Sequence, residues 1–291
     1  MSFEIKDVHS ENYKPIIEFY SKYGDRSYNW YDKKLKNEII SGTIIGKICI
    51  IKETNQIVAS YLCRIQPLLS NPSLKSVQSI DTLTAPSHRG SITGKLAKEF
   101  YEYLRTESFD CIYGLPNPRA DKFFYRILKW NLSRATYSYH VFIPVFILRF
   151  LYSFINFFTK GKNMFNYSFE KINQLNKKLI INSNCVENQN RGAYWVSYEH
   201  TFFTNIGLCR TGRNLNIFDK LYLLTMMSSV AKSFFLRTYS TNQTETAQIF
   251  SPFSFKKKAL NFSGVILKND CKFSFDEQSF EFIEFDTFGL K

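Results

Sequence analysis

The sequence predicts an α+β fold in which a mixed, mostly antiparallel sheet is flanked by helices. Short apolar runs rich in β-branched and aromatic residues follow one another, with turn residues between them. Segments with apolar residues at helical spacing interrupt this series. With 44% hydrophobic and 17% aromatic residues, a chain of 291 residues can bury one large core or two ordinary ones.

The chain is expected to begin with a strand followed by a helix. Phe3 to Val8 alternates as a strand does, and Asn12 to Tyr23 has apolar residues at helical spacing up to Gly24. The aromatic segment from Ser27 to Leu35 fits either a loop or a short helix.

Three strands are expected next. Residues 46–52 and 57–66 are β-rich runs separated by the four-residue turn E-T-N-Q, which predicts a hairpin. Residues 76–83 predict a third strand. These runs form the antiparallel part of the predicted sheet.

A loop holding a Pro, an Arg and two glycines then leads into an amphipathic helix, in the stretch T-A-P-S-H-R-G-S-I-T-G-K-L from Thr84. Backbone N–H groups at a helix N-terminus are unsatisfied donors at the positive end of the helix dipole, and small residues let a phosphate approach them. A plain turn would show the same pattern. The residues that offer this arrangement are Arg89, Gly90, Ser91, Ile92, Thr93 and Gly94.

Residues 111–115 are expected as a short buried strand, 121–129 as a helix and 135–142 as a returning strand. Antiparallel strands followed by a helical crossover to a neighbouring strand make a mixed sheet, with the glycine-containing loop at its centre.

A second round of elements is expected after a helical connector rich in Asn and Lys. The predicted domains are residues 1–143 and 191–291, joined by the connector 144–190, and the second domain weakly repeats the first. Its expected elements are strands at 193–198 and 201–210, a helix at 218–232, and strands at 247–251, 264–267 and 281–286.

The net charge of +13 suits an anionic partner such as a nucleotide cofactor or a phospholipid surface. The sequence shows no basic recognition helix and no aromatic RNA-binding motif, so a nucleic-acid partner is not expected. The six cysteines stand singly without a C-x-x-C pair, which predicts reduced thiols and no metal. The N-terminus, M-S-F-E-I-K-D-V, lacks the basic and apolar regions of a secretory signal, so the predicted location is the cytoplasm.

Residues 141–158, V-F-I-P-V-F-I-L-R-F-L-Y-S-F-I-N-F-F, are nearly long enough to span a bilayer, but Pro144, Arg149 and Asn156 interrupt them. A buried or interdomain helix, a helix on a membrane surface and a transmembrane helix all remain open. The following T-K-G-K favours peripheral membrane contact, which would place the protein at the inner membrane surface.

Several motifs together resemble the acyl-CoA N-acyltransferase (GNAT) superfamily. They are P-x-x-R-G at 86–90, the long helix after it, C-I-Y-G-L-P-N from Cys111, and the helix ending I-L-K-W. The phrase Y-G-L-P-N looks like the two-domain bacterial branch, in which G-[FL]-P-N follows the fifth strand and a degenerate second GNAT-like domain follows the first. The resemblance covers residues 1 to about 140 well and the second half loosely.

The resemblance implies that acetyl-CoA or another acyl-CoA is the co-substrate and a small-molecule amine the acceptor. The amides of residues 89–94 would bind the pyrophosphate, and Leu83 and Thr84 would border the pantetheine arm. Asn117 would match the Asn near the cofactor. Tyr125 would match the Tyr that protonates the departing thiolate, although it equally fits an aromatic core position.

Two departures from the family pattern bear on the cofactor pocket. Ile92 stands where the family loop R-G-x-G-x-[GA] has its inner glycine, and the spacing from Asn117 to Tyr125 is one residue longer than usual. These departures fit either a reshaped pocket or a lost one.

Asp81 is the expected general base, because strand alternation places it on the same face as Leu83, beside the cofactor. A merely solvated carboxylate would fit the same position. Tyr28, Trp30 and Tyr31 lie where the family shapes the acceptor site and could stack on a sugar or an aromatic acceptor, although packing between domains explains them as well.

Two functions remain open at this level. One is an N-acyltransferase that modifies an amine, with an amino sugar or nucleotide sugar of surface-polysaccharide biosynthesis as the acceptor suggested by family analogy. The other is a non-catalytic binding or scaffold protein that keeps the GNAT fold and docks on a membrane or a partner through residues 141–158.

Overall fold

The computed structural model describes residues 2–66, 73–116, 120, 122–159, 167–171, 193–199, 202–210, 214–241 and 244–268. These residues form two compact units. One unit holds the residues up to 133 and the described residues from 261 on, and the other holds residues 134–260. The chain passes from one unit to the other within β6 (Asn131–Val141) and again within β11 (Ser254–Ile266).

The predicted domains, 1–143 and 191–291 with the connector 144–190, divide the chain at other residues than these units do. The predicted repeat in the second half stays a prediction.

The sheet of the first unit has the strand order β1, β2, β3, β4, β5, β11. Neighbouring strands are antiparallel except for β4 and β5, which run parallel. The predicted mixed, mostly antiparallel sheet is therefore confirmed. The bounds are β1 (Phe3–Asp7), β2 (Ile44–Ile51), β3 (Gln56–Ile65), β4 (Ser76–Thr84) and β5 (Cys111–Gly114).

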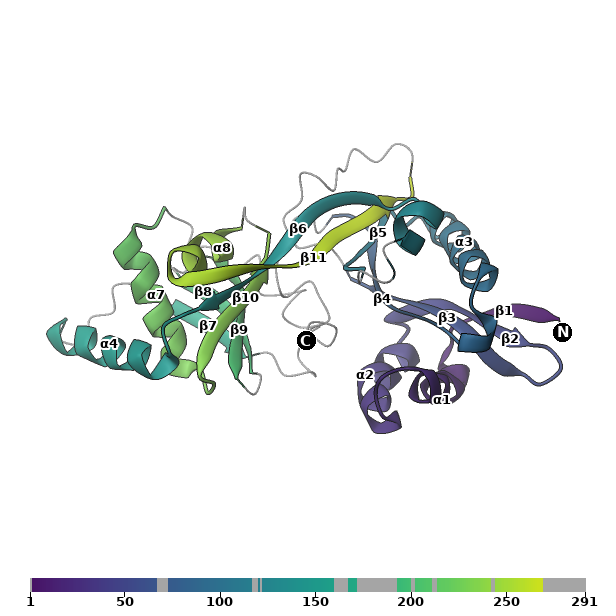
Figure 1. Cartoon of the computed structure of the whole chain (residues 1–291), viewed down its shortest axis with the longest axis horizontal. Helices are drawn as coiled ribbons and strands as arrows, with labels where there is room; N and C mark the ends of the chain where they lie inside the picture. Colours follow the sequence, from purple (N-terminus) through teal and green to yellow (C-terminus); the bar gives the residue numbers. More distant parts are fainter. Residues whose placement is uncertain are drawn as a thin grey trace. The chain divides into compact units, whose positions relative to one another are not determined.

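Helices cover both faces of this sheet (Figure 1). α1 (Tyr13–Tyr23) and α2 (Tyr28–Ile40) pack on one face, and α3 (Ser91–Thr106) packs on the other. Each helix buries an apolar stripe, because residues three or four apart lie on the same side of a helix. In α3 this stripe consists of Leu96, Phe100 and Leu104, all of them fully buried.

A chain of buried hydrogen bonds ties α3 to the sheet. The indole Nε1 of Trp130 donates to the Tyr101 hydroxyl at 2.6 Å, and the hydroxyls of Tyr101 and Tyr61 lie 3.1 Å apart. Burial raises the pKa of both tyrosines, that of Tyr61 well above its usual value, so both hydroxyls stay protonated. The three side chains satisfy one another inside the core, where an unpaired polar group would be costly.

The second unit has the strand order β6, β10, β9, β8, β7, with β11 beside β6. β6 pairs antiparallel with β10 and β8 with β9, whereas β10 and β9, like β7 and β8, are parallel. Three helices share one core with this sheet. The bounds are β7 (Tyr167–Lys171), β8 (Ala193–Glu199), β9 (Phe203–Arg210), β10 (Phe235–Ser240), α4 (Val145–Phe158), α7 (Ile217–Val230) and α8 (Glu245–Phe250).

The prediction of a strand at 247–251 is wrong, because these residues belong mostly to helix α8. The Thr244 hydroxyl caps this helix by accepting from Ala247 N at 3.0 Å. So short an apolar run has no periodicity that separates helix from strand. The aromatic segment that starts at Ser27 forms the beginning of α2. The strands β7 and β10 were not predicted. The strand expected at 281–286 lies outside the described residues.

We expect Tyr101→Phe to lower the free energy of unfolding by about 1–3 kcal/mol, because it leaves the Trp130 indole N–H buried without an acceptor. Urea denaturation followed by tryptophan fluorescence measures this. Tyr103→Phe is the matched control on the same helix, since Tyr103 is only partly buried, and it should change the free energy by less than about 0.5 kcal/mol. Equal losses in the two variants would contradict the role given to the Tyr101 hydroxyl.

Candidate active site

The strands β4 and β5 separate from each other in the middle of the first sheet. They pair only from Ser76 with Cys111 to Gln78 with Tyr113, although β4 continues to Thr84. Beyond Gln78, this edge of β4 has no partner among the described strands. An edge of this kind carries backbone donors and acceptors that an extended ligand can satisfy.

Two buried side-chain atoms along β4 have no hydrogen-bond partner among the described residues. They are Gln78 Oε1 and Thr82 Oγ1. Buried polar atoms in native proteins are rarely left unpaired, so each indicates a missing partner. Both lie on the strand that leaves β5, where a polar ligand could supply that partner.

A bulge in β4 lies between these two residues. Leu62 pairs with Asp81 whereas Cys63 pairs with Ser79, so Ile80 is the extra residue on β4. Beyond the bulge, Asp81 contacts α2 and Leu83 packs into the core under α1 and α2. The two side chains therefore share the face of the sheet that alternation predicts for them.

Gly90 places the N-terminus of α3 beside the end of β4. Its φ of +130° and ψ of −124° fall in a region that only glycine adopts readily. Gly90 at the N-cap position has no side chain to cap α3, and the first turn holds no acidic residue. The first N–H groups of the helix thus keep their positive end open to an anion. Arg89, before Gly90, is exposed, and the side chain of Ser91 lies outside the described set.

The remaining loop residues hold this N-terminus in place. Thr93 Oγ1 lies 2.6 Å from Thr84 Oγ1, which ties the first turn of α3 to the last residue of β4. Ile92 packs against the core under α3, so its side chain turns into the protein. A Cβ added at Gly94 would lie 3.4 Å from Ile127 Cγ2, an ordinary contact. Ile92 is therefore accommodated without standing in front of the helix N-terminus.

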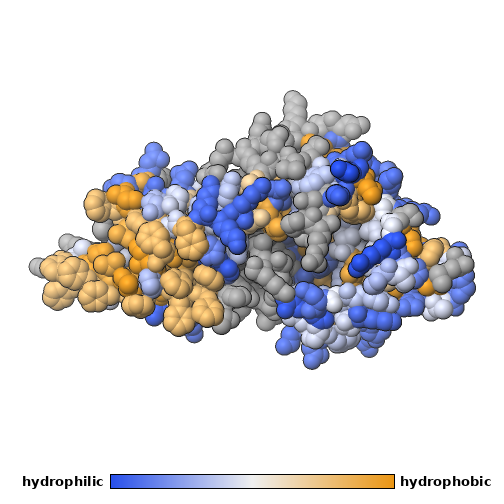
Figure 2. Space-filling view, in the orientation of Figure 1, coloured by the Kyte–Doolittle hydropathy of each residue, from blue (hydrophilic) through white to orange (hydrophobic). Residues whose placement is uncertain are grey.

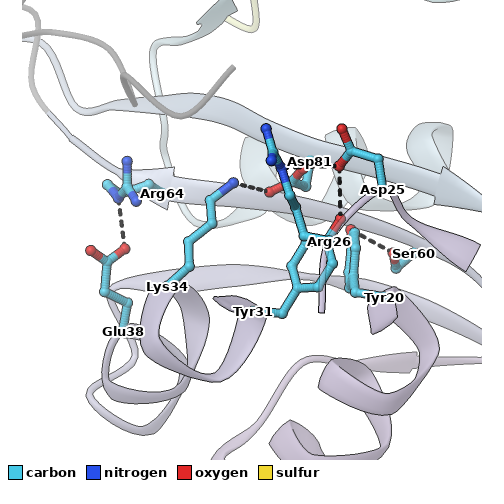
Figure 3. Close-up of polar contacts among 9 residues, drawn as sticks. All are labelled: Tyr20, Asp25, Arg26, Tyr31, Lys34, Glu38, Ser60, Arg64 and Asp81. Atoms are coloured by element: carbon cyan, nitrogen blue, oxygen red, sulfur yellow. Dashed lines mark hydrogen bonds and ion pairs between the residues drawn. The ribbon is translucent and has the colours of Figure 1, made fainter. Parts of the chain in front are cut away.

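An ion pair lies on the face of β4 that α1 and α2 cover, opposite to the face that α3 covers. Lys34 Nζ of α2 donates to Asp81 Oδ2 at 2.7 Å, and the two side chains are only 8% and 25% exposed (Figure 3). Nearby, Ser60 Oγ donates to the Tyr20 hydroxyl at 2.7 Å. Burial, and then the charge of Asp81, raise the pKa of Tyr20 well above its usual value, so its hydroxyl stays protonated. Asp81 thus lies in a half-buried polar site of fixed geometry.

The three aromatic residues of α2 take different positions. Tyr28 is 39% exposed, and Trp30 is partly buried with Lys34 Nζ 5.1 Å from its ring centre. Tyr31 is 4% exposed, packs against Tyr20 and directs its hydroxyl at Asp25 Oδ1 over 3.5 Å. Because its ring is covered on both faces, Tyr31 cannot stack on an acceptor as predicted. Tyr28 and Trp30 keep exposed ring surface.

Tyr125 lies in a single π-helical turn, Phe123–Ile127. Its hydroxyl donates to Ser263 Oγ of β11 at 3.2 Å, while its ring packs at the edge of the core under α3. Because Ile127 of the same turn borders Gly94, this turn adjoins the N-terminus of α3. Asn117 lies outside the described residues.

Lys34, Tyr20 and Ser263 belong to this site, and the sequence did not single them out. Lys34 follows Trp30 at helical spacing, the one signal that relates it to the aromatic residues. In the sequence, Tyr20 cannot be told from an ordinary core position of α1. Ser263 is far from Tyr125 in the sequence, and only the pairing of β5 with β11 brings the two together.

Among the described residues, no group of three or more His, Cys, Asp or Glu side chains could hold a metal ion. No helix of that part of the chain is long and apolar enough to cross a bilayer.

The fold is similar to that of solved GCN5-related N-acetyltransferases. A GCN5-related N-acetyltransferase from Kribbella flavida matches with a TM-score of 0.59 at 10% identity, over 91% of this chain and 72% of that one. A conserved protein from Enterococcus faecalis, described as a probable N-acyltransferase, matches with a TM-score of 0.60 at 12% identity, over 92% and 73%. At such identities the likeness shows the fold alone. Comparison with protein-family models finds no match, and comparison with curated proteins finds none either.

We expect Lys34→Met to lower the free energy of unfolding by about 1–2 kcal/mol, because it leaves the half-buried Asp81 carboxylate without its ammonium partner. Chemical denaturation measures this. Lys33→Met is the control, since Lys33 is the exposed neighbour on the same helix. Adding Asp81→Asn to Lys34→Met should recover part of the loss. Additive losses in the double variant would show that the pair contributes no coupling.

Proposed function

We propose that the protein is an acyl-CoA-dependent N-acyltransferase that transfers an acetyl or other acyl group to a small-molecule amine. The observation that carries this proposal is the separation of β4 from β5 beside the uncapped N-terminus of α3. These features put an unpaired strand edge next to a helix end that suits an anion, within the GNAT fold. A thioester with a long polar arm and a pyrophosphate needs both.

The residues around this edge fit an acyl-CoA. The amides of Gly90 to Gly94 would receive the pyrophosphate, with Gly90 supplying the backbone turn and the exposed Arg89 a positive charge. The unpaired edge of β4 at Leu83 and Thr84 would bond the amides of the pantetheine arm. Thr82 Oγ1 would gain the partner that it lacks.

The bound acyl-CoA supplies an activated thioester, and the side chains would manage the protons of the transfer. The amine nitrogen forms a bond to the carbonyl carbon as the carbon–sulfur bond breaks. Asp81 would take the proton that the amine loses, directly or through water, while Lys34 holds the carboxylate in place. Tyr125 would give its proton to the leaving thiolate, and Ser263 orients its hydroxyl. The β4 amide near Leu83 would polarise the carbonyl.

For the acceptor we propose an amino sugar or a nucleotide sugar, as in surface-polysaccharide biosynthesis. Tyr28 and Trp30 support this, since they offer exposed ring surface on the face of the sheet that carries Asp81. By extension we propose the two-domain bacterial branch of the superfamily, because both solved relatives match more than nine tenths of the chain. An acyl-CoA substrate also suits a cytoplasmic enzyme.

The second candidate function is a non-catalytic scaffold with the GNAT fold. The observation that favours it is the Asp81 and Lys34 ion pair, which already satisfies one oxygen of the expected base. A scaffold of this kind would need neither acyl-CoA nor Tyr125.

We expect millimolar CoA or acetyl-CoA to raise the thermal midpoint by a few degrees, since a ligand at 100 times its Kd stabilises by about 2.7 kcal/mol. Differential scanning fluorimetry measures this. Gly94→Trp should abolish the shift, because its indole cannot fit beside Ile127, whereas Gly94→Ala makes only an ordinary contact there and should keep it. The absence of any shift in the wild-type protein would favour the scaffold.

With an amine that the enzyme accepts, we expect Tyr125→Phe to lower kcat about 100-fold or more with little change in the KM for acyl-CoA. Release of free thiol during turnover measures the rate. Tyr103→Phe serves as the control outside the site and should keep full activity. Ser263→Ala should lower kcat less than Tyr125→Phe does, because it affects only the orientation of the phenol. An unchanged kcat in Tyr125→Phe would remove Tyr125 from the mechanism.

A further inference from the structure

Helix α4 has one face in the core of the second unit and one face in solvent. Val145 and Leu148 are buried against α7, and Tyr152 and Ile155 pack at the edge of the same core. These positions follow one another at helical spacing, so they form a single inward stripe. The rest of the helix faces outward.

The outward face of α4 is made largely of phenylalanine rings. Each of these residues is more than half exposed, from 52% for Phe154 to 79% for Phe157. Neighbouring rings contact one another, with centroids 6.4 Å apart for Phe150 and Phe154 and 4.6 Å for Phe154 and Phe158. We call this surface the phenylalanine stripe. It comprises Phe146, Phe150, Phe154, Phe157 and Phe158, and the hydropathy colouring shows it over α4 (Figure 2).

The stripe continues beyond the N-terminus of α4. Val145 N donates to Phe234 O at 2.8 Å, and the rings of Phe234 and Phe202 lie 6.0 Å apart. Both rings are more than half exposed. With rings of about 200 Å² each, the stripe alone exposes roughly 600 Å² of apolar surface. That is at the upper end of what a monomer carries without a partner.

The only ionic side chain of α4 is Arg149, which is exposed but bonded to the end of α7. Arg149 donates through Nε to Ser228 O at 2.9 Å and through Nη2 to Ala231 O, both at the C-terminal end of α7. A guanidinium is stabilised there by the negative end of the helix dipole. Arg149 thus interrupts the apolar run in the sequence, and its guanidinium is held at the end of α7.

The charges that flank the stripe in the sequence are mostly positive. Lys160 and Lys162 follow α4 directly, and Lys220 and Lys232 lie on and just after α7, which packs against α4. The one acidic residue of α7 is Asp219, whose carboxylate accepts from Asn216 N at the start of that helix. An aromatic helix face with basic residues beside it in the sequence and on the helix that it packs against complements an anionic lipid surface.

We propose that α4 docks the protein on an anionic phospholipid membrane, lying parallel to the surface with the phenylalanine stripe inserted among the acyl chains. A helix of 14 residues is about 21 Å long, shorter than the roughly 30 Å of a bilayer core, so it suits the interface rather than a span. This proposal goes beyond the acyl transfer proposed above and does not depend on it.

A lipid surface suits the stripe better than a protein groove does. A protein partner is usually fixed in register by a polar rim of hydrogen bonds around an apolar centre. The stripe offers one ring after another and, between Phe146 and Phe158, only Arg149 and Ser153 as exposed polar side chains. Such a surface defines a depth of insertion without defining a partner.

The test is co-sedimentation of the full chain with phospholipid vesicles. We expect binding to mixed phosphatidylglycerol and phosphatidylcholine vesicles, weaker binding to pure phosphatidylcholine, and release by high salt. The double variant Phe150→Gln with Phe154→Gln should lower the partition coefficient about tenfold or more, because it removes apolar surface that would insert into the membrane. Gln keeps good helix propensity, so α4 should still form.

Phe255→Gln is the matched control, because Phe255 is as exposed as the stripe residues but lies on β11. It should bind vesicles as the wild-type protein does. Circular dichroism and the thermal midpoint verify that each variant is folded. Equal binding by the double variant and the wild type, or no binding by either, would overturn the proposal. A dimeric wild-type protein that does not bind vesicles, together with a monomeric double variant, would also overturn the proposal. The stripe would then be a contact between two copies of the chain.

Discussion

The separation of β4 from β5 is the constraint on which the rest of the candidate site depends. While the two strands pair, their backbone groups satisfy one another, and past Gln78 the groups on that edge of β4 must find another partner. The bulge at Ile80 increases the local twist of β4. The contact between Thr84 and Thr93 then sets where α3 begins. An unpaired edge and an open helix end come together because of these three features.

Much of this arrangement could be predicted from the sequence, since it depends on local signals. The loop before α3 carries its glycine where φ is positive, and the alternation of β4 places Asp81 and Leu83 on one face. Ile92 was the doubtful position, because a sequence motif does not show which way a side chain turns. The structure turns it into the core under α3.

The parts that could not be predicted depend on contacts between distant segments. No local pattern pairs Lys34 with Asp81 or brings Ser263 to Tyr125, because only the sheet places them together. Tyr31 looked like Tyr28 and Trp30 in the sequence, and burial alone separates it from them. The long apolar run at 141–158 predicted a helix, but the bonds of Arg149 depend on where α7 ends.

The return of β11 to the first unit affects how the protein can be made. The strand that completes the first sheet lies more than a hundred residues after β5 in the chain, with residues 134–260 of the second unit between them. During synthesis on the ribosome, the sheet of the first unit therefore cannot be completed until β11 has been made. Until then, β5 is exposed at the edge of that sheet. A fragment ending near residue 143 would keep the phenol of Tyr125 and lose the serine that orients it. The two units are thus separate in their cores but interdependent in the order of folding.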